Sequence, residues 1–189
     1  KGKVLVGLSG GVDSGVSAAL LKQEGFDVTG VFIKIQVPGY PCPAGRDRIE
    51  AMRVAAHLRT PFIEIDLSKE YQEEVLKLSL KEFGRGRTPN PDALCNREIK
   101  FGKFFEFARR SGADFVATGH YAQIKNGKLY VSVDKEKDQS YFLWAVPETA
   151  LRCTLFPVGG LNKSTVRALA KKFGLPNATK KDSQGICFI

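Results

Sequence analysis

The chain has 189 residues, of which 43% are hydrophobic and 26% charged, a balance that excludes an extensively disordered polypeptide and favours one globular domain. Its apolar runs are short and interrupted by charge, which excludes a membrane-spanning helix, and no secretory leader precedes Val4, so we expect a cytoplasmic protein. Lysine and arginine number 29 against 20 acidic residues, and the resulting charge of +9 favours partners that carry phosphate.

The first part of the sequence alternates strand and helix patterns. Short apolar runs predict strands, and apolar residues at helical spacing predict helices. Strands are expected at residues 4–6, 28–33 and 62–65, and helices at residues 15–22 and 49–58. Alternation of this kind predicts an α/β fold, an open parallel sheet flanked by helices in the Rossmann-like manner.

The second part adds longer helices, a basic loop and a hairpin. Helices are expected at residues 68–83, 98–110 and 162–173, a strand at 114–118, and a basic glycine- and proline-rich loop at 84–92. The Asn126-Gly127 pair is a strong signal for a type I′ turn, so a small antiparallel hairpin should surround it. Asn162 or Ser164 can cap the last helix.

A glycine loop, Ser9-Gly10-Gly11-Val12-Asp13-Ser14, separates the first strand from its helix. Backbone N–H groups at a helix N-terminus carry partial positive charge, and adjacent glycines let an anion approach closely, so phosphate is the expected ligand. No GKS or GKT follows, which excludes a Walker-type loop. The alternative is an ordinary glycine turn capped by Ser14. Asp13 stabilises the N-terminus of the helix through its negative charge, helps to hold Mg²⁺, or does both.

The four cysteines, at positions 42, 95, 153 and 187, show neither paired CxxC spacing nor the density of a disulfide scaffold. Taken singly, each is more typical of a structural residue than of a catalytic one, because free cysteine is among the most buried residue types. Cys95 and Cys187 both lie beside turn-forming residues. Lysine pairs at 171–172 and 180–181 are typical of solvated surface.

The glycine loop is similar to the pyrophosphate-binding motif of the N-type ATP pyrophosphatases, the PP-loop superfamily. Four further strings follow it: NPDxxCNxxIKF at residues 90–101, TGHYA at 118–122, KDQSYFL at 137–143 and SxGICFI at 183–189. With them the chain resembles the tRNA-specific 2-thiouridylases of the MnmA type over essentially its whole length.

The resemblance implies roles for individual residues. It implies ATP binding by Gly7, Leu8, Ser9, Gly10, Gly11, Val12, Asp13, Ser14, Ile33 and Gly119, and tRNA contacts by Asn90, Pro91, Asp92, His120, Lys137, Asp138 and Gln139. Cys95 matches the family's nucleophile, with Asp92 among the catalytic residues, and Cys187 matches the cysteine that carries a persulfide. The implied cofactor is ATP with Mg²⁺, and the implied partners are tRNA and an upstream persulfide sulfur-carrier protein. We expect a monomer.

The implied reaction is 2-thiolation of the wobble uridine. ATP turns the C2 oxygen into a leaving group, the persulfide sulfur of Cys187 attacks C2, and Cys95 resolves the linkage by forming a disulfide with Cys187. The loop that holds Cys95 and the segment that holds Cys187 should therefore converge over the glycine loop.

Residues 1–189 are expected to form one PP-loop catalytic domain, in which residues 146–189 are a helical extension that carries the second cysteine. The family continues past this point into β domains that this chain lacks, so we expect a shortened form. Three alternatives stay open: a PP-loop synthetase that amidates a small metabolite, a module that binds nucleotide or RNA without turnover, and the same thiolation with an iron–sulfur cluster on Cys95, Cys187 and Asp92.

Overall fold

The computed structural model describes residues 1–37 and 44–182, so Cys42 and Cys187 lie outside the described residues. Its main sheet has five strands in the order β3-β2-β1-β4-β7, and every neighbouring pair is parallel. The strands are β1 (Lys3–Gly7), β2 (Asp27–Lys34), β3 (Phe62–Asp66), β4 (Phe115–Ala117) and β7 (Thr154–Leu155). The predicted open parallel sheet is therefore confirmed.

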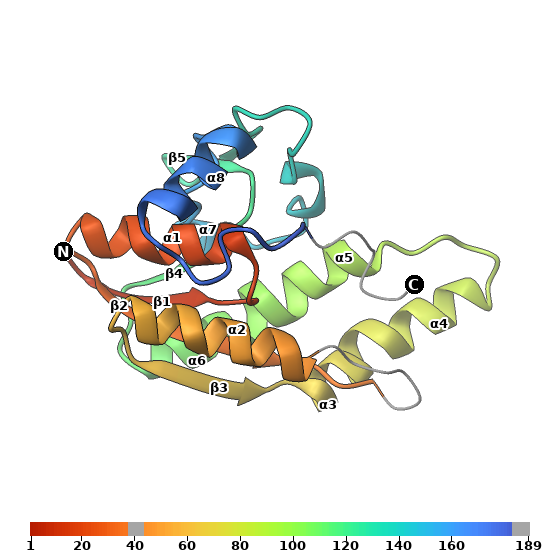
Figure 1. Ribbon diagram of the computed structural model, residues 1–189. Helices are drawn as coiled ribbons and strands as arrows, with labels where there is room; N and C mark the ends of the chain where they lie inside the picture. The colour runs from red at the N-terminus through yellow and green to blue at the C-terminus, as the bar shows by residue number, and fades with distance from the viewer. Residues whose placement is uncertain (38–43, 183–189) are drawn as a thin grey trace.

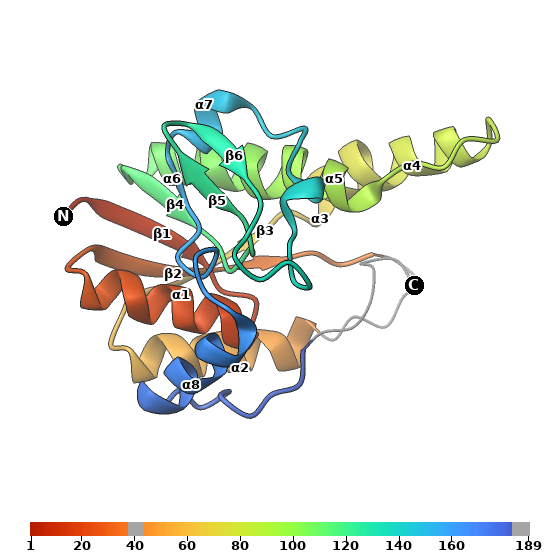
Figure 2. The same cartoon turned by 90° about the horizontal axis from the view of Figure 1, so that it is seen from above.

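Helices cover both faces of this sheet (Figures 1 and 2). One face is covered by α1 (Val12–Gln23), α2 (Ala44–His57) and α8 (Lys163–Lys172). The other is covered by the helix that runs through α5 (Pro91–Leu94), the π-helical segment η2 (Cys95–Lys103) and α6 (Phe104–Arg110), together with α7 (Glu148–Leu151). A third long helix, α3 (Ser68–Tyr71), π-helical η1 (Gln72–Leu76) and α4 (Lys77–Phe83), projects beyond the sheet.

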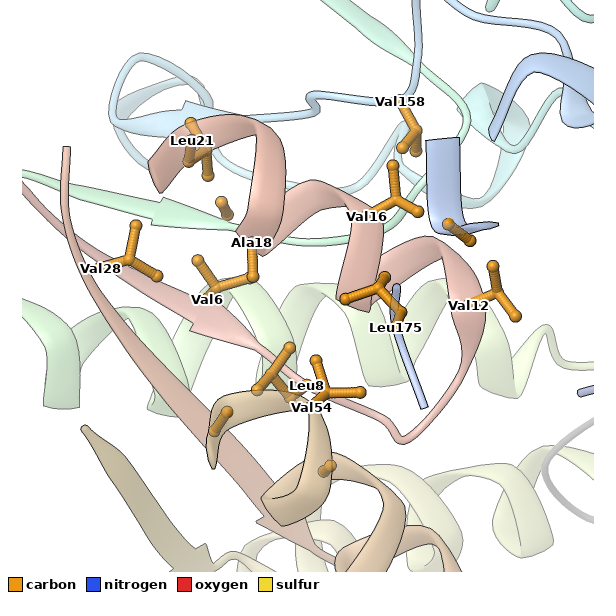
Figure 3. Packing of buried hydrophobic residues seen from close by; sticks show 14 of the residues in the cluster. Val6, Leu8, Val12, Val16, Ala18, Leu21, Val28, Val54, Val158 and Leu175 are labelled. Carbon is orange, nitrogen blue, oxygen red and sulfur yellow. The ribbon is translucent and has the colours of Figure 1, made fainter. Parts of the chain in front are cut away.

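Alternate side chains of β1 supply the two halves of the core, as the two-residue period of a strand requires. Val4 and Val6 are fully buried against α1, α2 and α8, whereas Leu5 packs toward α6 on the other face. Figure 3 shows Val6 among the side chains of α1 and α2. The centre of the sheet is thus buried on both sides, so a ligand can approach it at the strand ends.

The predicted hairpin is confirmed as β5 (Gln123–Lys125) and β6 (Lys128–Tyr130), an antiparallel pair. Asn126 and Gly127 join them with φ angles of 52° and 73°, the left-handed values that a type I′ turn needs. A short 3₁₀ turn, η3 (Ser140–Phe142), follows.

Two elements differ from the sequence-based expectation. The helix expected at 98–110 begins at Pro91, because Asn90 accepts a hydrogen bond from the Ala93 N–H at 3.0 Å and proline suits a first helical position. The segment after residue 146 is not helical throughout, because β7 joins the edge of the main sheet beside β4.

Candidate functional site

The glycine loop lies where the order of the sheet reverses. The chain moves from β1 outward through β2 to β3 and then returns to place β4 on the opposite side of β1. The loop after β1 and residues 118–120 after β4 therefore leave the sheet at the same edge, where the carboxyl ends of these two neighbouring strands lie. A crevice at such a switch point is where open α/β sheets bind ligands.

The start of α1 presents a backbone cradle. The first intrahelical bond of the loop runs from Gly15 N to Gly11 O at 3.3 Å, so the N–H groups of Val12, Asp13 and Ser14 precede the helical ladder. The Ser14 hydroxyl donates to Gly11 O at 3.1 Å and lies 3.3 Å from both the N–H and the hydroxyl oxygen of Ser9. Ser14 thus holds the loop in shape, while the N–H groups and the helix dipole favour an anion.

Two glycines make this geometry possible. Gly10 has a φ of +75°, a conformation that L side chains rarely adopt, and a Cβ there would collide with the carbonyl oxygen of Asp47. A Cβ on Gly119 would lie 2.6 Å from Ser14 N and 2.9 Å from the carbonyl carbon of Asp13. The backbone that follows β4 is therefore in close contact with the start of α1.

Asp13 is engaged with residues that sequence analysis did not single out. Its two carboxylate oxygens lie 2.7 and 2.8 Å from the Lys163 ammonium, and one of them accepts a hydrogen bond from the Tyr121 hydroxyl at 3.0 Å. The Lys163 side chain is only 15% exposed. The helix N-terminus therefore carries a carboxylate held by a cation from α8.

The segment at residues 177–180, which follows α8 and is called the strap below, forms hydrogen bonds with the carbonyl oxygens of the glycine loop. Asn177, which is buried, donates from Nδ2 to the carbonyl oxygens of Gly10 and Gly11, both at 3.0 Å. Lys180 donates to Gly10 O at 3.2 Å and pairs with Asp47 at 2.7 Å. The expectation that the lysine pair at 180–181 is solvated surface is wrong for Lys180, because these acceptors hold its ammonium, whereas Lys181 is exposed.

Cys95 lies in a helix rather than in the expected loop. It follows α5 directly, is 3% exposed, and packs with Tyr71, Ile33 and Ile99. Asp92 stands one turn earlier on the same helix, so the two side chains share a face. Because Ile33 is near the carboxyl end of β2, Cys95 lies toward the sheet edge that carries the glycine loop.

Four other predicted residues support structure around these positions. Asn90 caps α5, Pro91 occupies its first position, and both Asn90 and the basic loop before it are exposed. Leu8 and Val12 point into the core, at 2% and 4% exposed, so only their backbone atoms can serve a ligand.

His120 lies in an aromatic enclosure beside Gly119. Its ring centroid is 5.8 Å from both Phe101 and Phe156, and its Nδ1 is 2.7 Å from the Thr118 hydroxyl. Burial, reinforced by the positive charge of Lys100, holds the pKa of His120 well below its ordinary value. The ring is therefore neutral near pH 7, and any contact with a phosphate would be a hydrogen bond rather than an ion pair.

Of the predicted residues at 137–139, Asp138 and Gln139 are held by hydrogen bonds within the protein, and Lys137 is exposed. Asp138 accepts hydrogen bonds from the Ser132 N–H and the Ser140 hydroxyl, both at 2.7 Å, and Gln139 accepts one from the Tyr121 N–H at 3.0 Å. Lys137 is exposed and lies 3.3 Å from Asp182. Of the three, Lys137 has the side chain best placed to reach a partner.

Cys187 lies outside the described residues, so its predicted meeting with Cys95 stays a prediction. Within residues 1–37 and 44–182, no three His, Cys, Asp or Glu side chains gather as a metal site would require. In the same part of the chain, no helix is at once long and apolar enough to cross a bilayer.

Sequence analysis missed the partners of the loop, although signals for two of them exist. Lys163 opens α8, where a cation opposes the helix dipole, and such a lysine suggests a nearby carboxylate. Tyr121 belongs to the TGHYA string, and its hydroxyl reaches Asp13. Asn177 and Asp182 are 164 and 169 positions beyond Asp13 in the chain (177 − 13 and 182 − 13), and no local pattern connects them to the loop.

Comparison with known families gives one match that spans the chain. The sequence profile described as the tRNA methyl transferase HUP domain matches residues 2–189. Proteins named tRNA-specific 2-thiouridylase MnmA are similar throughout: the one from Nitrosomonas eutropha is 51% identical and the one from Enterococcus faecalis 46% identical, each over 100% of this chain. The chain spans about half the length of these relatives, 54% and 53% respectively.

Solved structures share the fold at low sequence identity. The U34-tRNA thiolase NcsA from Methanococcus maripaludis, solved with its [4Fe-4S] cluster, is 20% identical with a TM-score of 0.63 over 100% of this chain and 61% of that one. A 4-thiouridine synthetase–RNA complex with bound ATP is 19% identical, with a TM-score of 0.60 over 98% of this chain and 44% of that one. At this identity the likeness shows the fold alone.

Proposed function

This chain belongs to the family described as the tRNA methyl transferase HUP domain, and from that premise we propose that it is the ATP-using catalytic domain of a tRNA-uridine 2-sulfurtransferase. The relatives that are about half identical to it are named tRNA-specific 2-thiouridylases, which favours sulfur transfer over methyl transfer. The observation that carries the proposal is the anion cradle at the sheet's switch point, with Cys95 packed against the end of the adjacent strand.

The cradle fits the phosphates of ATP. The N–H groups of Val12, Asp13 and Ser14 point outward from the start of α1, and the closeness of Gly119 to Ser14 leaves only backbone on the facing side. Asp13 is the only carboxylate in residues 7–14, but the Lys163 ammonium holds both of its oxygens, so Asp13 would hold the accompanying Mg²⁺ only after that ion pair opens. Bound ATP would supply the chemistry of activation, in which the C2 oxygen of uracil becomes part of a phosphate leaving group.

The two cysteines would perform the sulfur transfer. The terminal sulfur of a Cys187 persulfide attacks C2, and the C2–O bond breaks as AMP leaves with that oxygen. The Cys95 thiolate then attacks the inner sulfur of Cys187, so that the S–S bond to the nucleoside breaks and a Cys95–Cys187 disulfide remains. A reductant of the thiol class restores both thiols, and a persulfide-bearing carrier protein reloads Cys187.

The burial of Cys95 and the position of Asp92 determine which movements this reaction requires. Because Cys95 is 3% exposed, it becomes reachable only when the side chains that cover it move aside. Asp92, on the same helical face, is placed to accept a hydrogen bond from the uridine or from the thiol. The target uridine has to leave its base stack to reach this edge of the sheet.

The test is mass spectrometry of nucleosides from unmodified tRNA that has been incubated with the chain, ATP, Mg²⁺ and a persulfide-loaded carrier. We expect replacement of one uridine oxygen by sulfur, and we expect Cys95→Ser to lower its yield roughly 10³-fold or more because the nucleophile is lost. Cys153→Ser is the matched control. Cys153 lies just before β7, at the amino ends of the strands, whereas the glycine loop follows the carboxyl end of β1. Unchanged thiolation by Cys95→Ser, or an added methyl group in place of sulfur, would reject the proposal.

A further inference from the structure

The helix that carries Cys95 changes its geometry in the middle. Between α5 and α6 the segment η2 is π-helical over nine residues, Cys95–Lys103, and the N–H of Phe104 that follows it bonds to the carbonyl oxygen of Ile99, five positions earlier. An α-helix closes each bond over four positions, so a π-helical segment accommodates one residue more between the same two flanks. Such segments are rare and occur frequently at functional sites.

The spacing of the buried side chains shows where the extra residue lies. Toward α6, Phe101 and Phe104 are buried three positions apart, as on one face of an α-helix. Toward α5 the spacing becomes five, from Asn96 to Phe101 (101 − 96) and from Ile99 to Phe104 (104 − 99). Both intervals include Lys100. Deletion of Lys100 would therefore bring both spacings to four, the value that an α-helix requires.

Gly102 is the residue that permits this geometry. A Cβ at position 102 would lie 2.8 Å from the carbonyl oxygen of Arg97, a backbone atom that cannot swing aside as the end of a side chain can. In an α-helix the carbonyl oxygen bonded to the N–H at position 102 belongs to Glu98, and alanine is the residue that suits an α-helix best. A side chain at position 102 is therefore compatible with an α-helix but not with η2.

The extra residue decides which side chains of the helix face inward. One residue corresponds to about 100° of helix rotation, and Phe101 fixes the half of the helix that leads to α6 in the core. In an uninterrupted α-helix Arg97 would point where Asn96 now points. Asn96 is 2% exposed and donates to the carbonyl oxygen of Phe142 at 3.1 Å. The Arg97 side chain is 37% exposed and pairs with Glu98 at 2.6 Å. The π-helical geometry thus buries an amide in place of a guanidinium.

The direction of Cys95 depends on the same rotation. Cys95 is 3% exposed and packs in a cluster with Ile33, near the carboxyl end of β2. In an uninterrupted α-helix it would take the direction of Leu94, which is half-buried at the border of that cluster. We propose that Gly102 is a positioning residue, which permits the π-helical segment and thereby directs Cys95 toward the end of β2. The inference rests on the proposed function for the role of the thiol, but not for its placement.

The test measures how fast the Cys95 thiol is alkylated in the folded chain, without ATP or tRNA. Iodoacetamide reacts when a thiolate sulfur displaces iodide, and peptide mapping by mass spectrometry assigns the product to one cysteine. We expect Gly102→Ala to be alkylated at Cys95 about tenfold faster than the unaltered protein, because the added methyl group excludes the π-helical geometry and turns the thiol toward solvent. Gly45→Ala is the matched control, since Gly45 lies in α2 and a Cβ there meets nothing within 4 Å.

Deletion of Lys100 separates positioning from loss of structure. Without the extra residue an α-helix keeps Asn96 and Cys95 in their present directions, so the deletion variant should be alkylated at Cys95 as slowly as the unaltered protein. Adding Gly102→Ala to the deletion should leave that rate unchanged, because alanine fits an α-helix. Circular dichroism and thermal melting check that each variant is folded. If Gly102→Ala alone does not fold, a folded double variant with a protected Cys95 supports the same role for Gly102.

The outcomes also separate this inference from the proposed function. An unchanged alkylation rate in folded Gly102→Ala, or a double variant no better protected than Gly102→Ala, would overturn the positioning role. The expected pattern of alkylation in a protein that never thiolates tRNA would reject the proposed function and keep the positioning role. Thiolation of tRNA by a protein in which Gly102→Ala leaves Cys95 equally protected would do the reverse.

Discussion

His120 shows how the environment of one residue can change its expected role. The sequence places it after the strand-end Gly119, and the family resemblance implies a tRNA contact there. In the structure its ring is enclosed by Phe101 and Phe156, and burial lowers its pKa well below 6.5. A charged ring in this enclosure would lose solvation, and within residues 1–37 and 44–182 no carboxylate pairs with it, so the neutral form is favoured.

The lowered pKa predicts a specific dependence of stability on pH. Above about pH 6.5 His120 is neutral in both the folded and the unfolded chain, so it contributes no pH dependence there. Below that pH the unfolded chain binds a proton that the folded protein does not, so the free energy of unfolding falls as the pH falls, by at most about 1.4 kcal/mol per unit. Urea denaturation at a series of pH values measures this slope.

His120→Gln should remove that part of the slope, because glutamine does not titrate. His57→Gln is the matched control, since His57 is exposed on α2, where its Nε2 lies 2.8 Å from the carbonyl oxygen of Phe173. Equal slopes for the unaltered protein and His120→Gln would contradict the lowered pKa.

The residue types at positions 9–14 predicted the anion cradle, but they did not predict the distant side chains that hold it in place. Two glycines followed by Val12, Asp13 and Ser14 at a strand–helix boundary indicate an anion site, because the requirement is local: free N–H groups and room for close approach. The partner of Asp13 is 150 positions away in the sequence (163 − 13), and long-range ion pairs leave no periodic pattern. The resemblance to a family supplied Cys95 as a candidate, but only the packing shows that it is buried in a helix.

At the scale of elements, the errors lie at helix boundaries and at the shortest strand. The stretch at 84–92 was expected to be a loop, without regular structure across much of it, yet Pro91 and Asp92 begin a helix, because a proline that disrupts a helix interior is favourable at its first position. β7 has only two residues, too few to show alternation, and its pairing with β4 fixes it. The elements β1, β2 and α1 were predicted to within three residues at each end, whereas α2 begins at Ala44, five residues before the expected start.

The strap after α8 is the element on which the glycine loop depends most directly. Replacing Asn177 with alanine removes two hydrogen bonds, to the carbonyl oxygens of Gly10 and Gly11, and leaves these acceptors to Lys180 and to the loop's own Ser14 and Gly15. We expect the free energy of unfolding to fall by about 1–3 kcal/mol, which for a chain of this size lowers the melting temperature by roughly 2–4 °C per kcal/mol. ATP affinity, measured by isothermal titration calorimetry, should weaken as well.

Asn162→Ala provides the comparison for this change. Asn162 is exposed and occupies the position before α8 without a side-chain capping hydrogen bond, so its loss should alter stability much less. If both variants unfold at the same denaturant concentration as the unaltered protein, the strap does not support the loop.

The whole molecule combines a compact α/β body with a basic extension. The helix through α3, η1 and α4 projects from the body and ends in the loop that carries Arg85 and Arg87 (Figure 1). Glu82 pairs with both arginines, at 3.2 and 2.9 Å, and the hydrogen bond from Arg87 is the main cause that lowers its pKa. The two arginine side chains are nevertheless 54% and 68% exposed and remain available to an anionic partner.

For the proposed binding of tRNA, a charge of +9 predicts an affinity that falls steeply with salt, because each neutralised phosphate releases counterions. Replacing Arg85 and Arg87 together with alanine should make the slope of log K against log salt shallower by roughly two. Fluorescence anisotropy of labelled tRNA at several salt concentrations measures the slope. Arg110→Ala, at the amino edge of the sheet, should leave it unchanged, and equal slopes for all three proteins would exclude the loop from the interface.

The two borders of the main sheet have a consequence for how this protein meets other chains. β7 offers only two residues of backbone, and β3 carries Glu64 and Asp66, which pair with Arg48 and Lys34. A short edge strand and a charged edge strand both disfavour pairing with a strand of another chain. Recognition by other macromolecules is thereby directed to side chains on helices and loops, and self-association into ribbon-like aggregates is disfavoured.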